Sequence, residues 1–240
     1  MKDGLPETTL VRRFDTHRLV SAKYRPRSES VLTRIADDDA HLSDIFDLDH
    51  ATNERLLAEN GRGAGIGPRD LVFDVPGYRV VNAAFAHAHP LGSRFNGPDR
   101  GAWYAAFELA TAQAEVAFHK TTEYAEIGRF DDRVTYDDYL SDVSAELHDL
   151  RGDARFRDCL SPTSYVASQK LAARLRDGGS LGVVYPSVRR PKGTCVACFR
   201  PSLVTNVRRA GTYTFVWDGS PAPKIRRGAG TARDAVTTRQ

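Results

Sequence analysis

Apolar residues recur along the chain at two spacings, which predict strands in some segments and helices in others. The first strand is expected within residues 17–24, centred on Leu19 and Val20. Further short runs with the composition of strands occur at 71–75, 78–85, 102–108, 180–186, 194–199 and 212–218. Together with the helical segments, these runs predict a mixed sheet.

Helical spacing of apolar residues appears in the stretch 28–60 and again from Thr111 onward. The glycines of 61–68 alternate, whereas a dinucleotide fingerprint needs G-x-G-x-x-G between a strand and a helix. We therefore interpret 61–68 as a flexible connection. The charged residues 121–160 are predicted to form helix and loop over the surface.

The segment 161–179 carries the signals of a helix with defined ends. Ser161 is expected to cap it, Pro162 to occupy its first helical position and Gly178 to end it. Its spacing directs three residues toward the core, namely Tyr165, Ala172 and Leu175.

These elements predict an α+β protein with a mixed sheet core flanked by helices and an N-terminal helical extension. We divide the chain into an N-terminal strand and helical extension (1–64), a catalytic domain (65–220) and a tail (221–240). The tail is basic and rich in Pro, Gly, Ala and Thr, so we expect it to be flexible and solvated, with a phosphate-contacting arm as the alternative.

Composition adds limits on function. The chain has 240 residues, of which 41% are hydrophobic and 27% charged, and a formal net charge of +3. Because the two signs of charge are mixed along it, we expect no direct binding of nucleic acid. There is no apolar run of about 18 residues and no apolar signal segment, so we expect no membrane span and a cytoplasmic protein. Three cysteines suit a reducing compartment.

Two pairs of residues resemble metal ligands but lack the rest of a site. Cys195 and Cys198 form a C-x-x-C, yet positions three apart on a strand point to opposite faces. We interpret them as small buried residues. His87 and His89 share a strand face without a carboxylate pattern. No metal site is predicted.

Glu115 has two interpretations. Near the start of a helix from Thr111, its charge complements the positive helix end by roughly 0.3–1 kcal/mol. Its neighbours Ala112, Ala114, Val116 and Ala117 are small and apolar, however. An ionised carboxylate beside a pocket with such walls can stabilise a developing positive charge.

Arg94 and Tyr104 also have two interpretations each, and Ser187 has one. Arg94 follows Gly92 and Ser93, so a phosphate could approach its guanidinium, and a surface salt bridge is the alternative. Tyr104 is either a core tyrosine or a platform for a flat ligand ring. Ser187 follows a strand and, taken alone, is a turn serine.

Taken together, these residues resemble the RES domain family. The stretch "SRFNGPDRGAWYAAFELATAQAEVAFH" (93–119) is similar to the family's G-G-R-W-N segment, tyrosine strand and A-E-V helix, and "GVVYPSVRRPKGTCVACFRP" (182–201) to its strand-Ser-x-Arg turn. The resemblance covers roughly 65–202. Two positions depart from the pattern, since Ser93 replaces a glycine and Phe95 a tryptophan.

The resemblance implies a fold like that of ADP-ribosyltransferases and a role as the toxin of a bacterial toxin–antitoxin pair. Such enzymes consume NAD⁺ by hydrolysis or phosphorolysis, or transfer its ADP-ribose, and need no metal or further cofactor. An Xre-like DNA-binding antitoxin neutralises them. The stretch 28–60 is our candidate for contact with that partner or for self-association into a homo-oligomer.

By the same resemblance, the catalytic residues are Arg94, Tyr104, Glu115 and Ser187. NAD⁺ binding is assigned to Arg94 and Asn96 together with Tyr104 and Ser187. Arg94 would bind phosphate, Tyr104 would pack on the nicotinamide or its ribose, and Glu115 would stabilise the cation. Ser187 would contact the dinucleotide or position Glu115.

Two rival functions stay open. One is an ADP-ribosyltransferase that modifies a protein or metabolite, and "QAE" (113–115) resembles the Q-x-E pattern of such enzymes. On a helix, however, these positions lie roughly 200° apart, which favours water or phosphate as the acceptor. The other rival is a nucleic-acid-binding or RNA-cleaving toxin, or a non-catalytic interaction module, and the lack of aromatic residues along a basic stripe argues against nucleic acid.

Overall fold

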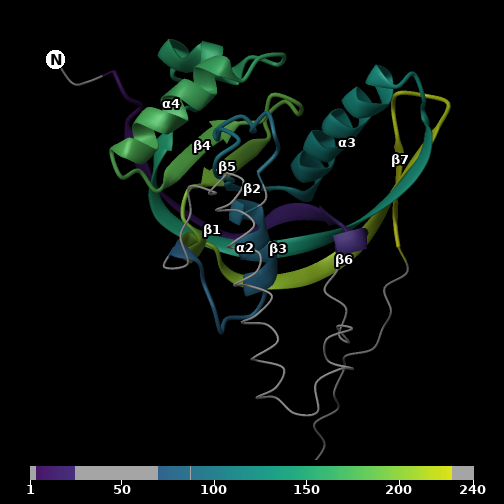
Figure 1. Cartoon of the computed structure of the whole chain (residues 1–240), viewed down its shortest axis with the longest axis horizontal. Coiled ribbons are helices and arrows are strands. Elements are labelled where there is room, and N and C mark those ends of the chain that lie inside the picture. Colours follow the sequence, from purple (N-terminus) through teal and green to yellow (C-terminus); the bar gives the residue numbers. More distant parts are fainter. Residues whose placement is uncertain (1–3, 25–69, 87, 229–240) are drawn as a thin grey trace, which may run out of the picture.

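A sheet of seven strands forms the centre of the computed structural model, which describes residues 4–24, 70–86 and 88–228 (Figure 1). The strands are β1 (Thr8–Ser21), β2 (Trp103–Ala106), β3 (Asp131–Asp149), β4 (Gly182–Pro186), β5 (Thr194–Cys198), β6 (Thr205–Asp218) and β7 (Lys224–Arg227). The predictions for 28–60 and 61–68 lie outside the described residues.

The sheet is mixed, as predicted. Its order is β1-β2-β5-β4-β3-β6-β7, and every pair is antiparallel except β3 with β4. Because β1 also pairs with β3, five strands close a circuit, and β6 and β7 extend from β3.

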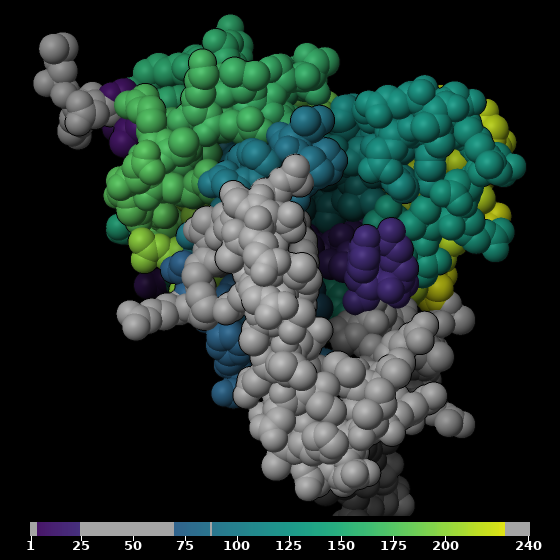
Figure 2. All heavy atoms as spheres, viewed as in Figure 1, coloured from purple at the N-terminus to yellow at the C-terminus, as the bar shows by residue number. Residues whose placement is uncertain are grey.

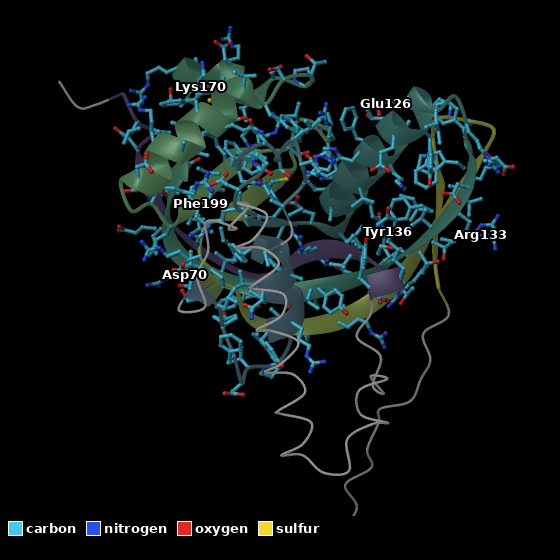
Figure 3. The ribbon with its side chains drawn as sticks, in the orientation of Figure 1. Asp70, Glu126, Arg133, Tyr136, Lys170 and Phe199 are labelled. Atoms are coloured by element: carbon cyan, nitrogen blue, oxygen red, sulfur yellow. The ribbon has the colours of Figure 1, made fainter. Side chains whose placement is uncertain are left out.

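Within the described residues, three α-helices and three short 3₁₀ turns accompany the sheet. They are α2 (Tyr78–Ala86), α3 (Leu109–Glu126) and α4 (Val166–Asp177), with η1 (Ala22–Tyr24), η4 (Ala154–Leu160) and η5 (Pro201–Leu203). Figure 1 shows α3 and α4 on one side of the sheet and α2 on the other. In Figure 3, Lys170 on α4 and Glu126 at the end of α3 accordingly lie above the strands.

The core follows this layering. Under α4 and the start of α3, Leu171 and Leu175 pack with Phe95, Val183 and Ala197. On the other face, a second cluster joins α2 to the sheet through Val81, Phe85, Trp103 and Val196. A third cluster lies under the later part of α3 and contains Tyr124, Tyr136, Phe215 and Trp217. The α+β interpretation is therefore confirmed.

Several predicted elements are confirmed with shifted ends. Strands form at the four ranges from 102–108 onward, and β6 begins earlier than the predicted 212. The first strand also begins earlier, at Thr8, and ends at Ser21. The helix predicted from Thr111 begins at Leu109.

The helix predicted over 161–179 is shorter at its start. α4 begins only at Val166, and Gly178 follows its last residue, Asp177, as the predicted end of the helix. Ser161 Oγ instead accepts hydrogen bonds from the backbone N–H groups of Thr163 and Ser164, which makes a turn before the helix. Ala172 and Leu175 are buried as predicted, and Tyr165 is half-buried.

Two predicted strands are wrong. Residues 78–85 form α2, because Val81 and Phe85, one helical turn apart, both enter the core and this packing overrides the β preference of the valines. Residues 71–75 form no strand. The Asn82 side chain bonds both the N–H and the carbonyl of Val72, which satisfies that backbone without a sheet.

The prediction of helix and loop over 121–160 is also wrong for its central part, where β3 runs for 19 residues. The many carboxylates of β3 suggested residues exposed at the surface. Asp137 and Asp138 are buried but partnered, the first by Thr212 and the second by His17 at 2.9 Å. The tail is likewise not wholly irregular. Lys224–Arg227 form β7, since backbone pairing with β6 needs no buried side chains.

Candidate active site

The turn after β4 forms one wall of the candidate site. Both the backbone and the side chain of Ser187 make hydrogen bonds within this turn. Its N–H donates to the Gly193 carbonyl at 2.8 Å. Its Oγ accepts from the N–H groups of Arg189 and Arg190 at 3.1 and 3.0 Å. A Cβ on Gly193 would lie 2.6 Å from Thr111 Oγ, so only glycine lets the turn approach α3 this closely. The turn is thus fixed against the start of α3.

Glu115 faces this turn from α3. Ser187 Oγ donates to Glu115 Oε1 at 2.7 Å, and Cys195 Sγ contacts the same oxygen at 3.9 Å. Within the described part of the chain, Oε2 makes no hydrogen bond. Because α3 begins at Leu109, Glu115 lies in the second helical turn, where the helix end acts more weakly than we expected. The carboxylate is therefore held by Ser187, with one oxygen left for a ligand.

Cys195 lies in the wall as a neutral thiol. Burial raises its pKa above the ordinary value, and the nearby Glu115 carboxylate adds to this shift. Cys195 belongs to the core cluster beneath α4, whereas Cys198 belongs to the cluster beneath α2. Their interpretation as small buried residues on opposite faces is confirmed.

Tyr104 on β2 ties the segment before it to the sheet. Its hydroxyl donates to Asn96 Oδ1 at 2.7 Å and accepts from the N–H of Phe95 at 2.9 Å. Burial raises the pKa of Tyr104, so the hydroxyl stays protonated. Asn96 is only 1% exposed, and its Nδ2 donates to the Gly97 carbonyl. Both Tyr104 and Asn96 therefore shape the pocket wall.

Arg94 is only 6% exposed, which excludes the surface salt bridge that we kept as an alternative. Its Nη1 donates to the carbonyls of Cys159 and Ser161 at 3.1 and 2.8 Å. Its guanidinium lies 4.7 Å from the ring centroid of Tyr165. Arg94 thus anchors the loop that leads into α4.

The four predicted site residues meet around Tyr185 on β4. Burial raises the pKa of Tyr185 well above its ordinary value. The nearby Cys195, Glu115 and Tyr104 raise it further, and Arg94 opposes them. Ser187 joins the group through Glu115. Figure 2 shows the surface hollowed where α3 (teal) faces the segment before β2 (blue).

Arg189, the arginine of the Ser-x-Arg turn, also lies in this group, although the sequence points to it only as an alternative to Arg94 for binding the diphosphate. Its Nη2 donates to the Pro162 carbonyl at 2.6 Å, and its guanidinium lies 3.2 Å from the ring centroid of Phe118 on α3. The available signal was its position two residues after Ser187. Among the described residues, no group of three or more His, Cys, Asp or Glu side chains could hold a metal ion, and no helix is long and apolar enough to cross a membrane.

Comparison with known proteins identifies the class of protein. The family model of the RES domain matches residues 71–218, more than half of the chain, and the chain belongs to this family. A search of curated proteins gave no match. Among solved structures, the crystal structure of the M. tuberculosis MbcT–MbcA toxin–antitoxin complex contains a similar chain, with 13% identity over 85% of each chain and a TM-score of 0.47.

Proposed function

We propose that this protein is a toxin that cleaves the nicotinamide–ribose bond of NAD⁺ and passes the ADP-ribose to water or phosphate. Membership of the RES family supports the proposal. The observation that carries it is the Glu115 carboxylate, with Oε1 held by Ser187 and Oε2 open to a ligand.

Cleavage leaves both bonding electrons on nicotinamide and a developing positive charge on the ribose. A fixed carboxylate facing that charge lowers the barrier without the cost of reorganisation. Glu115 supplies this carboxylate, and Ser187 positions it. Water then adds its oxygen to the ribose carbon and loses a proton, or phosphate adds directly. No step in this scheme uses a metal or a further cofactor.

The other assigned residues bind and orient the substrate. Tyr104 packs with the nicotinamide ribose, and Asn96 holds the turn beneath it. Arg94 contributes positive charge from inside the wall; direct contact of its Nη1 with phosphate requires release of the Cys159 and Ser161 carbonyls.

The acceptor is a small molecule in this proposal. Gln113 and Glu115 both lie on α3, where positions two apart differ by roughly 200°. The two side chains therefore cannot face one acceptor as a pair. NAD⁺ labelled in its adenylate half, added with the enzyme to lysate, should give free ADP-ribose or its 1″-phosphate. Label fixed on a protein band would instead identify a protein acceptor.

The direct test is incubation of the purified protein with NAD⁺. We expect nicotinamide to appear in step with the loss of NAD⁺. An intact NAD⁺ pool at micromolar enzyme would contradict the proposal.

As a toxin acting in the cytoplasm, the protein should also lower cellular NAD⁺ and arrest growth when it is produced alone. An Xre-like antitoxin would prevent both effects by masking the site. Unchanged NAD⁺ during strong expression would count against the toxin role.

A further inference from the structure

Two guanidinium groups near Glu115 have no carboxylate partner among the described residues. Arg94 and Arg189 both donate only to backbone carbonyls, and the acceptors Ser161 and Pro162 are consecutive. One short loop therefore engages both cations. A half-buried guanidinium without a counter-ion is poorly compensated and favours an incoming anion.

Arg189 is the more accessible of the two. It is half-buried, whereas Arg94 is 6% exposed. In Arg94, a single nitrogen donates hydrogen bonds to two backbone carbonyls. Arg189 keeps one such contact, to Pro162, and Pro162 is itself exposed. Its buried Nε has no hydrogen-bond partner. An anion that replaces the Pro162 carbonyl would thus find an arginine whose hydrogen bonding is incomplete.

The neighbouring Arg190 provides a contrast within the same turn. Its Nη1 donates to Thr111 Oγ at 3.2 Å and lies 3.9 Å from Glu108 Oε2. Its charge is therefore compensated by a carboxylate at the start of α3.

The position of Arg189 suits the diphosphate of a dinucleotide. Its backbone N–H bonds the same Ser187 Oγ that donates to Glu115, and its guanidinium covers Phe118, one helical turn beyond Glu115. In a dinucleotide, the first phosphate is attached to the ribose whose bond is cleaved. Because Ser187 joins Glu115 and Arg189 in one turn, a ribose that faces Glu115 can place its phosphate against this turn.

We infer that Arg189 binds a phosphoryl oxyanion, the diphosphate of the dinucleotide, in exchange for the Pro162 carbonyl. This inference rests on the proposed function. The planar guanidinium can hold two oxygens at once, with Phe118 fixing its plane.

The test measures binding of ADP-ribose by isothermal titration to wild type, Arg189→Gln and the matched Arg190→Gln. Arg189→Gln should raise the Kd about ten-fold or more, because a charge-assisted hydrogen bond is lost. Arg190→Gln should leave the Kd within about two-fold, as a compensated surface pair would. Nicotinamide riboside, which lacks the diphosphate, should bind Arg189→Gln as it binds wild type. Arg189→Lys keeps the charge but loses the planar guanidinium that can bind two oxygens, so it should show an intermediate Kd for ADP-ribose. This variant replaces Arg189→Gln in the test if Arg189→Gln fails to fold.

The outcomes separate the two proposals. Nicotinamide release by the wild type tests the cleavage of NAD⁺ alone, whereas the titrations need no turnover. An unchanged Kd for ADP-ribose in Arg189→Gln, or an equal loss of nicotinamide riboside binding, would overturn the role of Arg189. If Arg189→Gln keeps its ADP-ribose affinity but loses stimulation of turnover by inorganic phosphate, then Arg189 holds free phosphate and the diphosphate assignment is wrong.

Discussion

At the scale of single residues, the site depends on how Glu115 Oε1 is held. Ser187 Oγ contacts this oxygen at 2.7 Å, whereas Cys195 Sγ lies 3.9 Å away and is a weak donor. We expect Ser187→Ala to lower kcat for NAD⁺ cleavage about ten-fold or more, since a hydrogen bond to a charged group contributes about 1.5–3 kcal/mol. Cys195→Ala should lower kcat less.

Cys198→Ala is the matched control for the cysteine variant. Cys198 lies in the same strand and is equally buried, but in the cluster beneath α2. Cys198→Ala should lower the free energy of unfolding by a similar amount without changing kcat. Wild-type kcat in Ser187→Ala would show that Oε1 needs no such donor.

The Tyr104 hydroxyl should matter for stability as well as for the pocket. Tyr104→Phe keeps the ring but leaves the Phe95 N–H and Asn96 Oδ1 without their partner. An unsatisfied buried group costs about 1–3 kcal/mol, so the free energy of unfolding in urea should fall by about that amount. The Tyr213 hydroxyl makes no hydrogen bond in the described part of the chain, so Tyr213→Phe should leave the free energy of unfolding unchanged. Equal stability of both variants would contradict the role of this network.

The candidate site residues each lie in a short local pattern, and only the resemblance of these patterns together to the RES family assigns them to one site, which stays a prediction. Arg94 is flanked by small residues, Glu115 by alanines, and Ser187 follows a strand. Their contacts were not predictable. Ser187 and Glu115 meet across 72 residues, and the guanidinium of Arg94 lies inside the wall because of a loop that no sequence pattern indicated. The contacts of Arg189 could not be predicted for the same reason, since its Pro162 and Phe118 partners are distant in sequence.

At the scale of elements, α2 and the segment just before β2 meet at a backbone contact that only glycine allows. The Gly101 N–H donates to the Phe85 carbonyl at 2.9 Å, and a Cβ there would lie 2.1 Å from the Ala84 oxygen. Gly101→Ala should therefore push α2 from the sheet and lower the free energy of unfolding by about 1–3 kcal/mol. Gly4→Ala, with nothing within 4 Å, is the control. Indistinguishable melting temperatures would show that α2 adjusts freely.

Elements were predicted well where a strand is a short apolar run buried on both faces, and poorly where a strand carries charged residues whose partners are distant in sequence. β4 and β5 are short apolar runs and were predicted. β3 pairs with β1 and β6 along its length, and its aspartates are compensated by partners from those strands. A pattern of local charge cannot reveal such partners, so β3 was assigned to the surface.

At the scale of the whole molecule, the three cysteines should be chemically silent. Cys159, Cys195 and Cys198 are all free and buried. Burial raises the pKa of each thiol, that of Cys198 to about 12. At pH 8, below these raised values, the thiols stay protonated and react slowly with disulfide reagents. We expect almost no reaction in the native protein and three thiols after denaturation. Rapid native labelling would contradict this packing.

The central claim is that the Glu115 charge drives the cleavage of NAD⁺, and the most direct measurement compares nicotinamide release by wild type and Glu115→Gln. The substitution keeps the shape of the side chain and lets an amide oxygen accept from Ser187, but removes the charge. Loss of one preorganised electrostatic group typically costs about 10²–10³ in rate. The account predicts a kcat reduced by that factor at an unchanged melting temperature. Near-wild-type turnover by a folded Glu115→Gln variant would contradict it.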